Sequence, residues 1–263
     1  MPDNKIAFVT GGGSGIGRSI VRRLHADGFH VWIGDVDEDG ARAVATELGG
    51  GERARAVRCD VTDRTSLEDA LGAAYETGGR IDVLSANAGV SSMRPFLDIT
   101  DEDWDHNFEV NTKGAFRTIQ VAARRMVRQE PRAGMRLRGK VIATASMAAR
   151  QGAPFLAHYS ASKFAVTGLV HAAAKELAPL GVTVNAVNPG YVRTSMQARE
   201  VAWEGSLRGM TAEQVLEDYV SQTPLGRLEE PDDVAAVVSF LAGPDSDFLT
   251  GESIEVNGGA FIY

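Results

Sequence analysis

The sequence predicts an α/β fold, a single doubly wound domain in which helices cover both faces of a seven-stranded parallel sheet. Short apolar runs rich in β-branched residues alternate with longer amphipathic stretches along the chain. Strands that alternate with helices pair in parallel, because each helix carries the chain back to the same edge of the sheet. No linker, low-complexity tract or internal repeat interrupts the 263 residues, so we expect one domain over 1–263.

Turn and cap residues set the bounds of the expected elements. Asp63 and Thr100 precede amphipathic stretches, and their side chains can accept hydrogen bonds from the first helical turn. The irregular stretch 191–225, with an amphipathic piece at 212–219, is expected to cover the ligand crevice. The expected strands are 6–10, 31–34, 54–59, 83–87, 141–145, 182–187 and 253–256, and the expected helices are 15–27, 38–48, 157–180, 231–241, one after Asp63 and a long one after Thr100.

A glycine-rich turn, Thr-Gly-Gly-Gly-Ser-Gly-Ile-Gly, follows the first strand at residues 10–17. Glycine lets the backbone turn tightly and approach a pyrophosphate, while the next helix points its free N–H groups at the anion. The spacing differs from the strict Gly-x-Gly-x-x-Gly pattern, but the position between a first strand and a first helix predicts a dinucleotide site rather than a flexible loop. The predicted contacts are Gly11, Ser14, Gly15, Ile16 and Gly17.

Asp35 ends the second strand and is the residue that selects the cofactor. A carboxylate there can bind the ribose hydroxyls of adenosine and would repel a 2′-phosphate. Neither Val36 nor Ser14 offers a basic partner for such a phosphate, so NAD is favoured over NADP. The alternative reading is that Asp35 only caps the loop to the next helix.

Two further strand ends extend the predicted cofactor site. Asp60, after the third strand, either binds the adenine amino group or forms a turn with Thr62. Asn87-Ala88-Gly89, after the fourth strand, either passes close to the cofactor or forms an ordinary turn at the end of a strand.

Tyr159, Lys163 and Ser146 form the predicted catalytic group. Tyr159 and Lys163 lie four residues apart on an expected helix, so both side chains point to one face. A phenol titrates near 10 in water, and a neighbouring ammonium is expected to lower the pKa of Tyr159 so that it can exchange a proton with an alcohol. Ser146 ends the fifth strand at the carboxyl edge, where its hydroxyl can hold the substrate oxygen.

These motifs together resemble the short-chain dehydrogenases/reductases over essentially the whole chain. The resemblance implies a Rossmann-type fold that binds NAD, with Tyr159 as the general acid/base and Ser146 as the residue that orients the substrate carbonyl or hydroxyl. It also implies that Lys163 binds the nicotinamide ribose and tunes the tyrosine. The motifs that carry the resemblance are the glycine turn, Asp60-Val61, Asn87-Ala88-Gly89, Asn111, Ser146, the Tyr-Ser-Ala-Ser-Lys run at 159–163 and Asn188-Pro189-Gly190.

The same resemblance assigns residues that spacing alone leaves open. Asn111 would hold a water that links Lys163 to solvent, although by its position it reads only as a polar residue within a helix. Thr194 would bind the nicotinamide carboxamide, and the backbone of Val192 would add a contact there. Pro189 and Gly190 belong to the same predicted cofactor contacts.

The segment 192–226 resembles that of family members that act on small polyols, sugar alcohols and vicinal diols, the acetoin and butanediol dehydrogenases among them. A small alcohol or ketone is therefore the expected substrate. His158, which precedes the catalytic tyrosine, is expected at the surface or an interface rather than at the substrate. By position, the pocket is expected to be lined by Met147, residues 151–155 from Gln151 onward, Tyr191, Met196 and Trp203.

Two alternative functions remain open. The first is a 3-oxoacyl thioester reductase acting on acyl-carrier-protein or CoA substrates, against which Asp35 argues because reductive biosynthesis usually draws on NADPH. The second is a dinucleotide-binding sensor without turnover. Such a sensor would be expected to have lost the tyrosine or the lysine, and both Tyr159 and Lys163 are present.

Composition argues against other partners. A net charge of −8 disfavours nucleic acid, and the basic run 124–138 reads as a solvated helix end and loop. No apolar run reaches the roughly 18 residues that span a bilayer, and the first residues do not resemble a signal peptide, so we expect a cytoplasmic protein without a membrane partner. No metal-ligand spacing is present. The resemblance implies a homotetramer, and the apolar faces of 104–125 and 157–180 are wide enough to pack against a partner.

Overall fold

The computed structural model describes residues 4–262 and contains a seven-stranded sheet in the order β3-β2-β1-β4-β5-β6-β7. Every pair of neighbouring strands is parallel, which confirms the predicted fold class. The strands are β1 (Ile6–Thr10), β2 (His30–Asp35), β3 (Ala54–Arg58), β4 (Val83–Ala86), β5 (Gly139–Thr144), β6 (Val182–Pro189) and β7 (Ser253–Val256).

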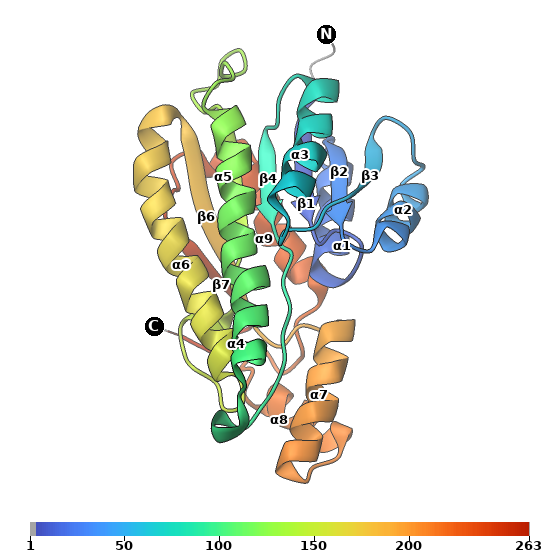
Figure 1. Cartoon of the computed structure of the whole chain (residues 1–263), viewed down its shortest axis with the longest axis vertical. Coiled ribbons are helices and arrows are strands. Elements are labelled where there is room, and N and C mark those ends of the chain that lie inside the picture. The colour runs from blue at the N-terminus through green and yellow to red at the C-terminus, as the bar shows by residue number, and fades with distance from the viewer. Residues whose placement is uncertain (1–3, 263) are drawn as a thin grey trace.

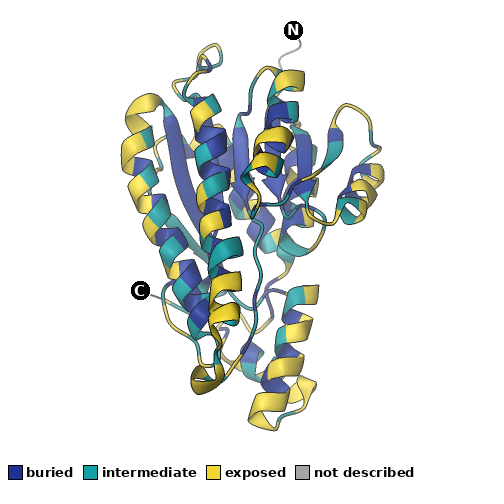
Figure 2. Ribbon diagram, viewed as in Figure 1, coloured by how far each residue is buried: buried dark blue, intermediate teal, exposed yellow. Residues whose placement is uncertain are grey.

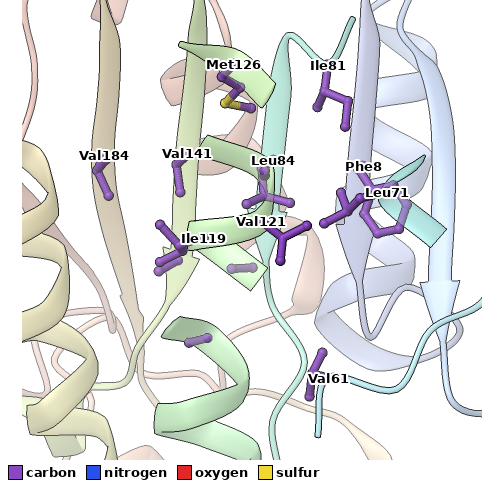
Figure 3. Packing of buried hydrophobic residues seen from close by; sticks show 14 of the residues in the cluster. Phe8, Val61, Leu71, Ile81, Leu84, Ile119, Val121, Met126, Val141 and Val184 are labelled. Atoms are coloured by element: carbon purple, nitrogen blue, oxygen red, sulfur yellow. The ribbon is translucent and has the colours of Figure 1, made fainter. Parts of the chain in front are cut away.

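Helices cover both faces of this sheet (Figure 1). Alternate strand residues point to opposite faces, so Phe8 packs in one hydrophobic cluster while Ala7 and Val9 pack in the other. Figure 3 shows Phe8, beside Leu71 of α3, on the first of these faces. One face carries α3 (Arg64–Gly78), α5 (Ala115–Met126) and α6 (Ala157–Leu177), and the other carries α1 (Gly15–Ala26), α2 (Glu38–Glu47) and α9 (Pro231–Ala242).

Two short helices lie beyond the carboxyl edge of the sheet. They are α7 (Ser195–Arg208) and α8 (Ala212–Ser221), in the stretch that was expected to be irregular and to cover the crevice. Figure 2 shows their outer surfaces exposed, while the strands behind the helices are buried. A separate small cluster that includes Val201, Val215 and Tyr219 holds α7 and α8 together. This segment therefore has its own small core and is more helical than expected.

The helix expected after Thr100 is interrupted. A capping box formed by Thr100 and Asp103 starts α4 (Asp101–Asn107), as predicted. A π-helical segment, Phe108–Gly114, then joins α4 to α5. A Cβ added to Gly114 would lie 2.8 Å from the Val61 side chain, so glycine allows this segment to pack against the cofactor edge. π-Helical segments often mark functional sites.

The basic run lies at the opposite edge of the sheet, where β4 and β5 begin. Arg132 and Arg80 both form ion pairs with Asp82, at 2.9 and 2.7 Å. Asp82 also accepts a hydrogen bond from the backbone N–H of Ile6, at 2.8 Å. These contacts give the run a structural role at the amino-terminal edge. Within residues 4–262, no helix is both long and apolar enough to cross a membrane.

Candidate active site

A cavity of about 570 Å³ opens at the carboxyl edge, where β1 and β4 are neighbours and the strand order reverses. Ligands of doubly wound sheets bind at such switch points. The cavity brings together every residue predicted to bind the cofactor. These are Gly11, Ser14, Gly15, Ile16, Gly17, Asp35, Asp60, Val61, Asn87, Ala88, Gly89, Tyr159, Lys163, Pro189, Gly190, Val192 and Thr194.

The glycine turn is packed too closely to accept side chains at two positions. A Cβ on Gly17 would lie 1.9 Å from the carbonyl oxygen of Gly11. A Cβ on Gly11, whose φ is +65°, would lie 2.9 Å from the Cα of Ala88. The Asn87 side chain donates hydrogen bonds to the carbonyls of Thr10 and Gly11, both at 3.2 Å, and so ties the turn to the end of β4. This bare backbone before α1 fits a pyrophosphate.

Asp35 makes backbone contacts at the glycine turn and also faces the cavity. Its carboxylate accepts hydrogen bonds from the backbone N–H groups of Gly13, at 2.8 Å, and Asp37, at 3.0 Å. It also lines the cavity beside Val36, which is 60% exposed and carries no charge. Asp35 therefore stabilises the glycine turn and presents a negative charge to whatever binds there.

Asp60 forms the turn that the sequence suggested. Its carboxylate accepts hydrogen bonds from the backbone N–H of Thr62, at 2.9 Å, and from the Thr62 hydroxyl, at 2.6 Å. These bonds lower the pKa of Asp60, so it is a carboxylate at neutral pH. Asp60 also lines the cavity, so the turn does not remove it from the candidate site.

Tyr159 and Lys163 lie on α6 and meet at the cavity, as their spacing predicted. The Lys163 ammonium donates a hydrogen bond of 2.9 Å to the carbonyl of Thr144 and lies 5.8 Å from the centre of the Tyr159 ring. Burial lowers the pKa of Lys163 to about 8. Ser146 follows β5, accepts a hydrogen bond of 3.1 Å from the backbone N–H of Ala148, and lies beside the phenol.

The expectation that Lys163 lowers the pKa of Tyr159 is wrong for this structure. Burial raises the pKa of the phenol, the carboxyl of Glu200 raises it further, and only the Ser146 hydroxyl lowers it. The Lys163 ammonium donates its hydrogen bond to the Thr144 carbonyl instead, and it is not among the groups that shift the pKa of the phenol. The tyrosine is thus a weaker acid here than in water.

Asn111 lies in the π-helical segment and is buried. Its side chain accepts a hydrogen bond of 2.8 Å from the backbone N–H of Val90 and donates one of 2.9 Å to the Val90 carbonyl. It also donates to the Ser162 hydroxyl at 3.0 Å. A Cβ on Gly89 would lie 3.1 Å from Asn111 Oδ1 and 3.3 Å from Lys163 Nζ, so both side chains converge on this glycine.

A second cavity of about 460 Å³ adjoins the first under α7 and α8. Seven of the residues predicted to line the substrate pocket are found here: Met147, residues 151–155 and Tyr191. Met196 lines the cofactor cavity instead, and Trp203 is 38% exposed and lines neither. The prediction for Trp203 is wrong because this residue lies on an exposed part of α7.

His158 corrects another expectation, because it is fully buried rather than at the surface. Its Nε2 is 2.8 Å from the hydroxyl of Ser92, which also accepts a hydrogen bond of 3.2 Å from the Asn107 side chain. His158 lines neither cavity. Through Ser92, it therefore connects α6 to Asn107 of α4.

Comparison with known proteins agrees with this geometry. The family model of the short chain dehydrogenases matches residues 5–205. The chain belongs to this family. It is 40% identical to an L-2,3-butanediol dehydrogenase of Corynebacterium glutamicum, over 97% of this chain and 98% of that protein. A diacetyl reductase ((S)-acetoin forming) of Staphylococcus epidermidis is 37% identical over 97% of this chain and 98% of its own.

Solved structures of similar proteins contain either form of the cofactor. A 3-ketoacyl-(acyl-carrier-protein) reductase from Brucella melitensis, complexed with NADH, is 30% identical with a TM-score of 0.87 and 98% coverage of both chains. An actinorhodin polyketide ketoreductase with NADPH is 34% identical with a TM-score of 0.91, over 100% of this chain and 99% of that one. As a short-chain dehydrogenase, the protein is an oxidoreductase that interconverts secondary alcohols and ketones with a nicotinamide dinucleotide.

Two carboxylates of this short-chain dehydrogenase were not identified from the sequence. Glu200 of α7 lines both cavities. Glu229 is 7% exposed and accepts a hydrogen bond of 2.7 Å from the backbone N–H of Gly190, which lines the cofactor cavity. No local pattern marks either residue, since each lies among other acidic and polar residues in a segment that reads as a loop or a helix surface.

Proposed function

We propose that the protein oxidises a small vicinal diol or polyol, or reduces the matching hydroxyketone, with NAD(H). The observation that carries the proposal is the position of Ser146 and Tyr159, which line both the cofactor cavity and the cavity under α7 and α8. A substrate in the second cavity would thus meet the proposed acid/base beside the cofactor. Relatives named as a butanediol dehydrogenase and a diacetyl reductase support a small vicinal substrate.

NAD is the proposed cofactor because of charge at the adenosine end. Asp35 places a carboxylate in the cavity, next to an uncharged Val36. A 2′-phosphate there would lie against a negative charge, whereas ribose hydroxyls can donate hydrogen bonds to it. The same contacts that tie Asp35 to the glycine turn hold the carboxylate in position.

The proposed catalytic roles follow from the positions of Tyr159, Ser146 and Lys163 at the larger cavity. When bound, the nicotinamide supplies the carbon that accepts or donates the hydride. In oxidation, the Tyr159 oxygen takes the proton from the substrate hydroxyl, and in reduction it returns a proton to the carbonyl oxygen. The Ser146 hydroxyl, beside the phenol, holds the same substrate oxygen. Lys163 and Asn111 converge on Gly89, and we assign to Lys163 the nicotinamide ribose and to Asn111 a water that links Lys163 to solvent.

The remaining cofactor and substrate assignments are made by position. Thr194 begins α7, and its side chain lies 3.4 Å from where a Cβ on Gly15 would be, so it faces the glycine turn across the cavity. We assign to Thr194 the carboxamide of nicotinamide and to Val192 a backbone contact. Met147, Gln151, Tyr191 and Met196 would contact the substrate.

We also propose that the chain forms one domain over 1–263 and assembles as a cytoplasmic homotetramer. Phe116 of α5 is 39% exposed and Phe164 of α6 is 46% exposed, so each helix presents an aromatic ring at its outer surface. Exposed apolar surface of this kind often marks an interface. Light scattering of the purified protein should give four times the chain mass.

The test is formation of NADH by the purified protein with NAD⁺ or NADP⁺ and a panel of meso-2,3-butanediol, xylitol, ribitol, sorbitol and galactitol. Turnover of at least one of these with NAD⁺, and a much lower rate with NADP⁺, is the expected result. Reduction of acetoacetyl-CoA by NADPH, at a rate above any alcohol oxidation, would overturn the proposal in favour of a 3-oxoacyl thioester reductase. Binding of NADH without any turnover would instead favour a dinucleotide sensor.

A further inference from the structure

Glu200 lies at the junction of the two cavities. Five residues line both of them, and among these five Glu200 carries the only carboxyl group: the others are Ser146, Tyr159, Gly190 and Tyr191. It belongs to α7. The side chain of Thr194, which lines the larger cavity, caps the first turn of this helix and so holds the helix in position beside that cavity. A substrate that reaches Tyr159 therefore passes this carboxyl group.

Glu200 is not neutralised by a neighbouring cation. In the part of the chain that the structure describes, no lysine or arginine lies within ion-pair distance of it. Arg199 lowers the pKa of Glu200 and Glu204 raises it, so the two effects oppose each other. Burial raises the pKa of Glu200, and the nearby hydroxyl of Ser91 lowers it. That hydroxyl is itself buried without a hydrogen-bond partner among the described residues, so the two groups are close but not bonded.

Glu204, one turn further along α7, differs from Glu200 because its carboxylate has partners within the protein. It forms an ion pair of 2.5 Å with Arg208 and accepts a hydrogen bond of 2.5 Å from the Tyr219 hydroxyl. Arg208 also pairs with Asp218, at 2.7 Å. These charged groups of the second cavity bind one another, which leaves Glu200 as the carboxylate with capacity to accept a hydrogen bond from a ligand.

When no substrate is bound, the charge of Glu200 disfavours the deprotonated form of the proposed acid/base, Tyr159. Its charge raises the pKa of Tyr159, so less of the tyrosine is present as phenolate, the form that accepts the proton in alcohol oxidation. A partly buried carboxylate whose nearby donor, the Ser91 hydroxyl, is outside hydrogen-bond geometry is also incompletely compensated for its loss of water. A substrate hydroxyl that donates a hydrogen bond to Glu200 would offset the cost of taking the carboxylate out of water.

We propose that Glu200 is a specificity-determining residue that accepts a hydrogen bond from a second hydroxyl group, on the carbon next to the reacting carbinol. The inference rests on the proposed function and names the chemical feature that this site requires. A site built to bind a hydroxyl rejects the analogue without it, because the polar group of the site is then left unpaired. A 2-position methylene, as in a 3-oxoacyl thioester, offers no such donor.

The experiment compares meso-2,3-butanediol with 2-butanol, which has the same carbon chain and lacks the second hydroxyl. The wild type should oxidise the diol with the higher kcat/KM. Glu200→Ala should lower kcat/KM for the diol by about 10- to 100-fold, the range expected for a hydrogen bond to a charged group, and should leave that for 2-butanol unchanged or raise it. Glu200→Gln keeps an acceptor oxygen without the charge, so its loss should be smaller, with most of the change in KM.

The matched control is Glu217→Gln, which removes an exposed carboxylate of α8 that lines neither cavity. It should leave both substrates unchanged. An equal fall for both substrates in Glu200→Ala would show a purely structural role, and unchanged kinetics would show no role, so either result overturns the inference while the proposed function stands. If the wild type oxidises no diol or polyol, the proposed function fails and this inference fails with it.

Discussion

Glu229 makes a quantitative prediction about pH and stability. Burial raises its pKa from 4.5 to about 8, and Asp233 adds to the rise, while Arg227 and the N–H of Gly190 oppose it. The folded protein thus binds a proton more tightly than the unfolded chain. This stabilisation is complete below pH 4.5 and is lost as the pH rises towards 8. The whole shift corresponds to roughly 5 kcal/mol, because one pKa unit equals about 1.4 kcal/mol.

Replacing Glu229 by Gln should remove this dependence on pH. Glutamine keeps an oxygen that can accept the hydrogen bond from Gly190 and carries no charge at any pH. We expect the free energy of unfolding of Glu229→Gln to exceed that of the wild type by about 2–5 kcal/mol at pH 9 and to equal it within about 1 kcal/mol at pH 5. The lower end of this range applies if the protein around Glu229 rearranges at high pH and lets water reach the ionised carboxylate.

The assay is urea denaturation followed by tryptophan fluorescence at pH 5 and pH 9. Glu252→Gln, in which an exposed carboxylate beside β7 is neutralised, serves as the control and should give the same difference from the wild type at both pH values. The reasoning is refuted if Glu229→Gln changes stability equally at pH 5 and pH 9, or if it is less stable than the wild type at pH 9.

Three further predictions concern the reaction. Tyr159→Phe should lower kcat by about 100- to 10,000-fold and leave NADH affinity, measured by fluorescence titration, within about 3-fold; retained activity would exclude Tyr159 as the acid/base. Asp35→Asn should raise kcat/KM for NADP⁺ at least about 10-fold because it removes repulsion of the 2′-phosphate, with exposed Asp39→Asn as control; an unchanged ratio of NADP⁺ to NAD⁺ would contradict this. Glu200→Gln should move the rising limb of kcat/KM for oxidation to lower pH, since Glu200 raises the pKa of Tyr159, whose other neighbours Ser146 and Lys163 are unchanged; a fixed limb counts against the coupling.

Local patterns were enough to predict the sheet and the cofactor side of the site. In the glycine turn after β1, a Cβ on Gly17 would lie 1.9 Å from the carbonyl oxygen of Gly11. Only glycine permits this contact, so the residue type alone indicates the turn. The spacing of Tyr159 and Lys163 on one helix face likewise fixes their meeting at the cavity. In both cases the residues that define the geometry are close in sequence.

The π-helical segment could not be predicted in the same way. The sequence 101–126 has the helical capping and periodicity of one long helix, and these features are local. The interruption depends on Asn111, whose three side-chain hydrogen bonds go to Val90 and Ser162, 21 and 51 residues away. His158 was placed wrongly for a similar reason, because its partner Ser92 is 66 residues away and no local signal shows that they meet.

Glu200 and Glu229 are both carboxylates whose pKa burial raises, and what each one faces separates their roles. Glu229 already accepts a hydrogen bond from Gly190 and lies in a bridge to Val192, so it holds the backbone of two residues that line the larger cavity. Among residues 4–262 no backbone N–H donates to Glu200, which lies where the cavities meet. Charge removal at Glu229 should therefore change stability and spare the preference for a diol over 2-butanol, whereas charge removal at Glu200 should change that preference with little effect on unfolding. Two substitutions of the same chemical kind thus test whether an internal donor or a substrate satisfies each carboxylate.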